Sequence, residues 1–463
     1  MPPDPTRPGR PLFTAMKPAH RKAHQAHSDK NQLLPRRYYR WVIWFSISLY
    51  LLFFSSSSSL FPLAPFRPHK LSSLRKPTSL PVQALIDAAA PKGNLLSRNA
   101  KPAGGGGVPD PMSLRIYVYD LPSRYNRDWL ANPRCATHLF AAEVALHRVL
   151  LDSPVRTRDP HDADFFFVPV YVSCNFSTPN GFPSLGHARG LLSSAVDLVS
   201  ARYPFWNRSG GADHVFVASH DYGACFHAME DVAVAHGLPA FLKRSIILQT
   251  FGVDRPHACQ DVEHVLIPPY VPPELVQLPS LPPARDIWVF FRGKMEVHPK
   301  NISGHIYGKG VRTEIWRRYG SNPRFYVKRK RYEGFRSEIA RSAFCLCPLG
   351  WAPWSPRLVE SVALGCVPVV IADGIRLPYP DAVRWGDISL RLPEREVGRL
   401  EAVLRRVAAT NLSAIQRRLW DPANREALLF HRPMRPGDAT WHVLRALSSK
   451  THRSWRGRSA AQK

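Results

Sequence analysis

The residues best suited to chemistry lie in one stretch, Phe344–Pro378, which contains the run GWAPWSPRLVES. Ser355 is a good helix N-cap, and Pro356 suits the first helical position because its missing N–H would be unsatisfied there anyway. A helix N-terminus offers free N–H groups to a phosphate, and Arg357 adds a planar guanidinium there. Glu360, about one turn later, can accept hydrogen bonds from sugar hydroxyls. The pattern predicts a site for a nucleotide diphosphate and its ribose.

Two apolar runs must position this helix. Phe344–Cys347 and Cys366–Ala372 are predicted strands, and Gly365 ends the helix between them. Helix-then-strand units of this kind occur in any doubly wound domain. An alternative interpretation therefore makes Arg357 and Glu360 an ordinary solvated ion pair.

A second group of candidate residues follows another apolar run, Ile287–Phe291. Arg292 and Lys294 lie at the carboxyl end of this predicted strand, and Gly293 between them permits close approach of the backbone. Arg312 opens a predicted helix after a glycine-rich turn. We expect Arg292 and Arg312, beside Gly293, to contact a donor phosphate or an acidic sugar. The alternative is an ordinary basic loop, and Lys294 fits either interpretation.

Several segments, taken in order, resemble the exostosin-like glycosyltransferases, and the plant branch in particular. They are RIYVYDLP (Arg115–Pro122), ADFFFVPVYVSCNFS (Ala163–Ser177), DHVFVASHDYGACFH (Asp213–His227), ILQTFG (Ile247–Gly252), IWVFFRGK (Ile287–Lys294) and the stretch Phe344–Pro378. The resemblance covers about Leu114 to Leu447. It is greatest to the members described as glucuronosyltransferases of secondary-wall glucuronoxylan synthesis.

The resemblance implies an α/β fold of the GT-B type, in which two Rossmann-type domains face a cleft. The pattern of residues agrees, because strands and helices alternate in both halves and a proline-dense connector, Pro268–Pro283, lies between them. We expect an acceptor-side domain over residues 113–284 and a nucleotide-sugar-binding domain over residues 285–449. The expected substrates are a UDP-sugar, with glucuronic acid as the sugar, and a xylan-type polysaccharide, without a further cofactor.

Three alternatives stay open. A neighbouring branch, the xylan-backbone xylosyltransferases, shares many of these motifs and would act on the backbone or its terminal oligosaccharide. An inactive chain could serve as a scaffold with other xylan-synthesis glycosyltransferases. A Golgi carbohydrate-binding protein would bind glycan without binding UDP.

Inverting transfer needs a general base that takes the proton from the acceptor hydroxyl. In GT-B enzymes this base usually comes from the first domain. His220 and Asp221 follow the predicted strand 214–218 and have suitable types and positions, and Glu143 is a further candidate. The alternative is a structural loop in which Asp221 caps a helix that starts at Cys225.

Asp162-Ala-Asp164 suggests the Asp-x-Asp motif with which GT-A glycosyltransferases hold a divalent ion. Here the pair precedes the FFFVPVY run instead of following a strand, so it would lie at the end remote from the cleft. We therefore interpret it as a strand-entry turn and expect metal-independent chemistry.

The N-terminal region predicts a membrane anchor. Trp41–Phe61 comprises 21 residues without a charge, and about 20 such residues span a bilayer. Nine Lys or Arg residues and two acids precede it in residues 1–40, which indicates a cytosolic tail and a luminal body. We expect a single-pass type II Golgi membrane protein; a cleaved signal peptide is the alternative. Residues 62–112 form a predicted disordered stem, and the basic tail 450–463 is expected to be disordered too.

Sequons, cysteines and charge agree with a luminal body. N-glycosylation sequons begin at Asn175, Asn207, Asn301 and Asn411. Of seven cysteines some should pair in an oxidising lumen, and the odd number leaves at least one over. The formal net charge of +28 favours anionic partners, and the luminal location excludes nucleic acid among them.

Overall fold

The computed structural model describes residues 110–174, 185–277, 284–296, 307–330 and 332–461, together with residues 44 and 48. The chain divides into two compact units, Met1–Lys76 and Pro77–Lys463, and the elements below belong to the second. The predicted anchor and stem lie almost wholly outside the described residues. Within the described part of the chain, no helix is both long enough and apolar enough to cross a membrane.

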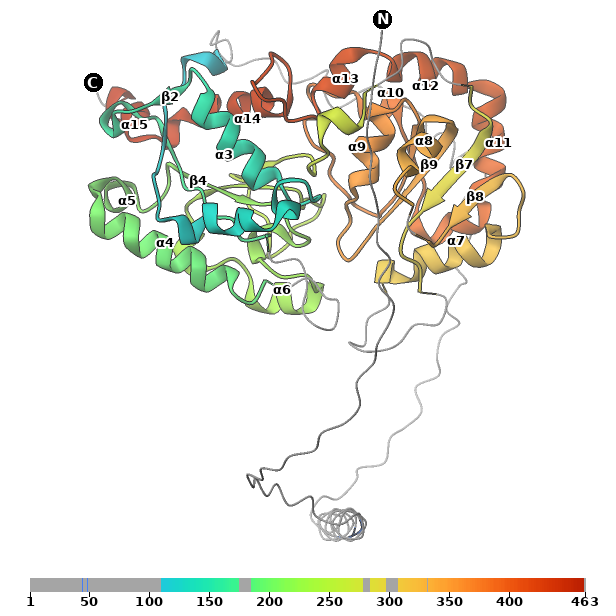
Figure 1. The fold of residues 1–463 in the computed structure, drawn as a ribbon, viewed down its shortest axis with the longest axis horizontal. Helices are drawn as coiled ribbons and strands as arrows, with labels where there is room; N and C mark the ends of the chain where they lie inside the picture. The colour runs from blue at the N-terminus through green and yellow to red at the C-terminus, as the bar shows by residue number, and fades with distance from the viewer. Residues whose placement is uncertain are drawn as a thin grey trace, which may run out of the picture. The chain divides into compact units, whose positions relative to one another are not determined.

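The first half forms a parallel sheet in the order β2-β1-β3-β4-β5-β6. Figure 1 shows β2 and β4 of this sheet among the helices of the first half. Its strands are β1 (Ile116–Val118), β2 (Arg156–Thr157), β3 (Phe165–Phe167), β4 (His214–Ala218), β5 (Ile246–Gln249) and β6 (Val265–Leu266). Its helices are α3 (Ala142–Asp152), α4 (Ala188–Arg202), α5 (Pro204–Ser209) and α6 (Glu230–His236). Phe165 and Phe167 share a core cluster with α3 residues, whereas Phe166 lies in another with α4 residues. Helices therefore cover both faces of this sheet, as the alternation of elements predicts.

The second half forms another parallel sheet, in the order β11-β10-β9-β7-β8. Its strands are β7 (Ile287–Arg292), β8 (Phe325–Lys328), β9 (Ser342–Pro348), β10 (Val367–Ile371) and β11 (Leu390–Arg391). Its helices are α7 (Val311–Tyr319), α8 (Phe335–Ala340), α9 (Pro356–Ala363), α10 (Trp385–Ile388), α11 (Leu400–Thr410), α12 (Leu412–Leu419) and α13 (Pro422–Glu426). All of β9 is buried, which agrees with the apolar run from Ala343 to Pro348.

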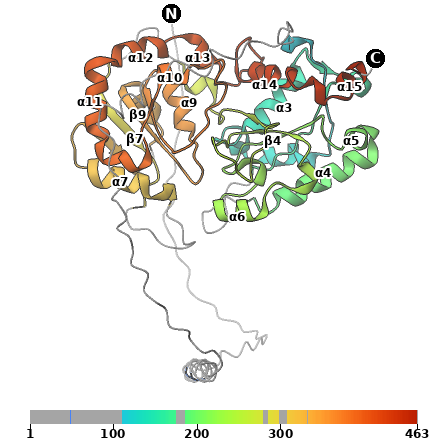
Figure 2. The ribbon, with the colours of Figure 1, turned by 180° about the vertical axis from the view of Figure 1, so that it is seen from behind.

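The C-terminal segment returns to the first half of the body, so the prediction of a disordered tail from Lys450 is wrong. After α14 (Ala439–Ser448), residues Thr451–Arg453 form a 3-10 turn and Trp455–Ala461 form α15. Figures 1 and 2 both show α14 and α15 beside α3 and α5. Lys450 Nζ lies 2.9 Å from Glu263 Oε2, and Arg453 Nε donates to the carbonyl of Ala212 at 3.2 Å. These partners are remote in sequence, so the basic composition of the tail does not reveal them.

Three disulfides and one buried free thiol account for the cysteines. The pairs are Cys135–Cys174, Cys225–Cys259 and Cys345–Cys366, and Cys347 is free. Partial pairing with one cysteine left over is the expected outcome for an odd count and is confirmed.

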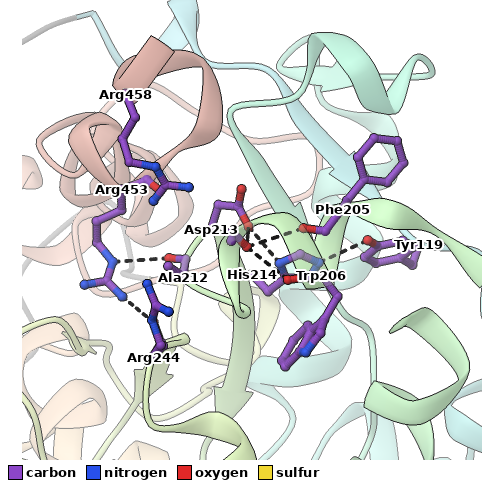
Figure 3. A network of polar contacts seen from close by, with 10 residues as sticks. Tyr119, Phe205, Trp206, Ala212, Asp213, His214, Arg244, Arg453 and Arg458 are labelled. Carbon is purple, nitrogen blue, oxygen red and sulfur yellow. Dashed lines mark hydrogen bonds and ion pairs between the residues drawn. The ribbon is translucent and has the colours of Figure 1, made fainter. Parts of the chain in front are cut away.

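A buried polar network holds the amino end of β4 (Figure 3). His214 Nδ1 lies 2.8 Å from Asp213 Oδ1, which also accepts from Ser209 Oγ at 2.6 Å, and His214 Nε2 lies 3.0 Å from the Tyr119 hydroxyl. Burial lowers the pKa of His214, so the ring is neutral, with Nδ1–H donating to Asp213 and Nε2 accepting from Tyr119. This network lies at the amino end of β4, whereas the site is predicted at the carboxyl ends of the strands. It holds β4 in place at that end.

Candidate active site

The topology places a ligand site where β7 and β9 lie side by side. In the second sheet the chain runs from β7 outward to β8 and then crosses back to β9. Ligands of such doubly wound sheets bind at the carboxyl ends of the strands beside this change of direction. Two loops meet at this point, Gly293–Lys294 after β7 and Leu349–Ser355 after β9. Both contain residues that the sequence predicts for the donor site.

The N-terminus of α9 is built as the sequence predicts. Ser355 has extended backbone and its hydroxyl accepts from the Arg357 N–H at 3.4 Å, with Pro356 in the first helical position. The Arg357 guanidinium donates to the Arg292 carbonyl and lies 4.9 Å from the centre of the Phe291 ring. Its Nε is buried without a hydrogen-bond partner in the described structure. An unsatisfied cationic donor beside a helix N-terminus is suited to an anionic ligand.

Arg312 shapes the loop after β9. Its Nε donates to the Leu349 carbonyl at 2.7 Å and one terminal nitrogen donates to the Pro348 carbonyl at 3.1 Å, while the guanidinium lies 4.7 Å from the Tyr307 ring centre. The side chain is buried, so its charge remains close to the loop although its donors are occupied. Arg312 therefore positions the loop and adds positive potential to the site.

Gly293 separates the two guanidiniums. A Cβ added there would lie 3.2 Å from a terminal nitrogen of Arg357 and 3.5 Å from one of Arg312. The groups that approach the Gly293 backbone closely are thus these two arginine side chains. Lys294 lies next to them, with its ammonium 5.4 Å from the Trp351 ring centre.

Arg292 is not brought into this cluster. Its guanidinium makes two hydrogen bonds to Glu338, at 2.6 and 2.7 Å, and lies near the rings of Tyr326 and Tyr332. Only its carbonyl, which accepts from Arg357, faces the predicted donor site.

Glu360 has a partner that the sequence does not reveal. It is buried and its Oε1 lies 3.0 Å from a terminal nitrogen of Arg336 on α8, so the solvated pair with Arg357 does not form. Burial raises the pKa of Glu360, and Arg336 and Arg357 oppose that shift. Arg336 belongs to a short helix distant in sequence, and no local motif marks it as part of the site.

The loop after β4 brings His220 and Asp221 against the loop after β9. Trp354 Nε1 donates to the Asp221 carbonyl at 3.2 Å, and the Tyr222 hydroxyl donates to the Trp351 carbonyl at 2.8 Å. The two sheets therefore meet at the carboxyl ends of β4 and β9. The predicted helix from Cys225 is wrong, since only a 3-10 turn, Gly223–Cys225, follows, and Asp221 does not cap it.

The two candidate bases differ in their electrostatics. His220 is buried, neither ring nitrogen has a hydrogen-bond partner among the described residues, and burial lowers its pKa to about 3. Burial raises the pKa of the neighbouring Asp221 carboxyl to about 7, opposed by the charge of Arg312. His220 Nδ1 lies 3.6 Å from Asp221 Oδ2. A base is most effective when its pKa lies near the working pH, which favours Asp221 over His220.

Glu143 and the Asp162-Ala-Asp164 pair lie elsewhere. Glu143 is buried and accepts from the N–H groups of Val172 and Ser173, at 3.2 and 2.9 Å, which holds the loop after β3. Asp164 lies before β3 and accepts from the Arg115 N–H at 2.9 Å. Over the described ranges, no group of three or more His, Cys, Asp or Glu residues is arranged to hold a metal ion.

Two of the predicted glycosylation sites can be located. Asn207 at α5 and Asn411 between α11 and α12 are both exposed. Asn175 and Asn301 lie outside the described residues.

Comparison with known proteins agrees with the motifs. The chain is 60% identical over 421 residues to a probable glucuronoxylan glucuronosyltransferase of Arabidopsis thaliana, covering 90% of this chain and 87% of the relative. It is 56% identical over 441 residues to a second probable glucuronoxylan glucuronosyltransferase of the same plant, IRX7, covering 94% and 98%. The probable beta-1,4-xylosyltransferase IRX10 of Arabidopsis thaliana is 43% identical over 345 residues, covering 74% and 83%. The exostosin GT47 domain matches residues 111–407. The resemblance seen in the motifs is thus confirmed, and the chain belongs to the exostosin GT47 family.

Proposed function

We propose that this protein is an inverting glycosyltransferase of glucuronoxylan synthesis in plant secondary walls. It transfers glucuronic acid from a UDP-sugar to a xylan-type polysaccharide. The observation that carries the proposal is that the loop leading into α9, where the buried Nε of Arg357 has no partner in the described structure, contacts the loop that carries Asp221 through the Trp354 side chain. The names of the two glucuronosyltransferase relatives described above support the donor sugar and the acceptor.

The donor diphosphate binds at the N-terminus of α9. Its negative charge is stabilised by the positive end of the helix dipole, by the unpartnered Nε of Arg357 and by the buried charge of Arg312. Glu360, held by Arg336, accepts hydrogen bonds from the ribose. These groups stabilise the departing UDP without a metal ion, in a GT-B arrangement whose cleft lies between the two parallel sheets.

Asp221 acts as the general base. Its ionised carboxylate takes the proton of the acceptor hydroxyl while that oxygen forms a bond to the anomeric carbon of the donor. The bond from this carbon to the diphosphate oxygen breaks at the same time, and UDP leaves with the bonding electrons. His220 remains neutral and lies against the carboxylate.

A second candidate is transfer of xylose to the xylan backbone. The similarity to IRX10 supports it, although at a lower identity than the two glucuronosyltransferase relatives. Both candidates use the same site residues and differ in the donor sugar.

The proposed location is the Golgi membrane, with a type II anchor over residues 41–61 and a luminal body. The uncharged run, the three disulfides and the exposed sequon residues Asn207 and Asn411 support this location, because disulfides and N-glycans form in the secretory pathway. Other xylan-synthesis glycosyltransferases are proposed as partners there.

The test is a transfer assay with the full-length chain expressed in a secretory host. Wild type, Arg357→Ala and the control Arg405→Ala, which changes an exposed arginine on α11, are incubated with UDP-sugars and xylo-oligosaccharides, with and without chelator. We expect a mass gain of one glucuronic acid, insensitive to chelator and lost in Arg357→Ala alone. A gain of xylose would favour the second candidate. The absence of both transfer and UDP binding in the wild type would refute the proposal.

A further inference from the structure

A groove on the α8 side of the second sheet is not used by the proposed chemistry. Helix α8 has six residues, about 9 Å of helix, whereas the six residues of β7 beneath it extend about 20 Å. The short helix leaves part of the β7–β8 surface uncovered, and an open groove of about 730 Å³ results. It is lined by Asp286, Ile287, Arg292, Tyr326, Tyr332, Ser337, Glu338 and Arg341.

The charges that line this groove neutralise one another. Arg292 pairs with Glu338 at 2.6 Å, and Arg341 pairs with Asp286. Two arginines thus face two carboxylates, and the half-exposed pair of Arg341 and Asp286 still offers hydrogen bonds along its edges. Such walls have no net charge with which to attract a nucleic acid or a polyphosphate.

The second feature of the groove is its planar side chains, aromatic rings and a guanidinium, which can pack against a sugar. Tyr332 is 53% exposed although it is a large aromatic residue. The Arg292 guanidinium lies 5.4 Å from the Tyr332 ring centre and 5.9 Å from that of Tyr326, whose hydroxyl donates to Glu338 at 2.9 Å. A pyranose ring has apolar C–H faces that pack on such rings and hydroxyls at its edge that bond to planar polar groups.

The groove is elongated and begins beside the donor site. Arg292 lies at the carboxyl end of β7, where its carbonyl accepts from Arg357, and its side chain enters the groove. Asp286 lies at the opposite, amino end of the same strand. A ligand that fills this length is a chain of sugars, since a single sugar or nucleotide base would occupy one end.

We infer that this groove binds a stretch of the neutral backbone of a polysaccharide, away from the residue that receives the transferred sugar. The inference rests on the proposed function for the identity of the polymer, xylan. It gives the enzyme a preference for long acceptors, because the groove adds contacts that a short oligosaccharide does not reach.

The test uses the full-length protein and two changes that act differently. Tyr332→Ala removes the exposed ring, and Ser337→Trp fills the groove from the exposed side of α8, with Ser337→Ala as the matched control. Binding of soluble xylan is measured by retardation in xylan-containing native gels, and binding of UDP by calorimetry. Transfer is compared on short and long acceptors.

We expect Tyr332→Ala to weaken xylan binding by about 5-fold, the effect of losing roughly one aromatic packing contact. Ser337→Trp should weaken it by at least as much, because the indole occupies the space that the sugar chain would fill. In both variants, UDP affinity and transfer to short acceptors stay at wild-type values. The control Ser337→Ala binds xylan as tightly as the wild type. A wild type that xylan does not retard, or groove variants that bind xylan normally, would overturn the inference. So would a loss of UDP affinity in both variants, which would assign the groove to the nucleotide. Xylan binding with these effects but without sugar transfer would refute the proposed function alone.

Discussion

Replacing Asp221 by asparagine tests the electrostatics of the proposed base through stability alone. Burial raises the pKa of this carboxyl from 3.8 to about 7 in the folded protein. Between these values the folded protein holds a proton that the unfolded chain has released, so raising the pH favours unfolding. A difference of about three pKa units, at about 1.36 kcal/mol each, destabilises the wild type by up to about 4 kcal/mol above neutral pH.

Asparagine has nearly the same shape and no charge to bury. The stability of Asp221→Asn relative to the wild type should therefore rise between about pH 4 and pH 7 and then level off. Urea unfolding followed by circular dichroism across this range measures the difference. Asp197→Asn, on the exposed side of α4, controls for the loss of a surface carboxylate. A difference that does not change with pH would refute the assignment of a buried, protonated carboxyl.

The same variant tests the catalytic role. The wild-type kcat/KM should fall about tenfold per pH unit below about pH 7, because only the ionised carboxylate accepts a proton. Asp221→Asn should lose roughly 10²- to 10⁴-fold in kcat while binding UDP normally. If the variant keeps its activity, another residue is the base, whatever the stability measurement shows.

Three further changes address the donor site and its framework. Arg357→Lys loses the guanidinium contact with the Arg292 carbonyl, so calorimetry should find UDP binding weaker by about 10- to 100-fold; equal affinity would contradict the phosphate role. Gly293→Ala places a Cβ 3.2 Å from the Arg357 guanidinium and should also weaken UDP binding; normal binding would mean that the close approach has no functional consequence. Replacing Cys345 and Cys366 by serine opens a disulfide with a sequence separation of 21 and should reduce the free energy of unfolding by about 3 kcal/mol. A loss under about 1 kcal/mol in urea unfolding would show that this disulfide restrains the unfolded chain much less than its loop length predicts.

Much of the local structure of the site follows from the sequence. The cap at Ser355, Pro356 in the first turn and the apolar runs before and after α9 appear where the pattern predicts them. These features depend on backbone hydrogen bonds and side-chain periodicity within a few residues, which a short stretch of sequence contains in full. The family also follows, because its motifs are runs of this kind.

The partners of the charged residues do not follow from the sequence. The sequence predicts Arg292 for the donor site, yet its side chain forms an ion pair with Glu338. Glu360 forms an ion pair with Arg336, a residue that no motif singles out. Both partners come from α8, which the fold places beside β7 and α9. A guanidinium can pair with any carboxylate that folding brings near it, and its choice depends on packing and not on neighbours along the chain.

The sequence alone therefore determines the N-terminal cap of α9, the apolar strands before and after it and the family of the chain. Only the tertiary structure decides the disulfide pairs, the return of the C-terminal helices to the first half of the body and the contact of Asp221 with Trp354. The physical reason is distance along the chain. Local elements form from interactions between near neighbours, whereas these contacts join segments whose proximity exists only after both sheets have packed.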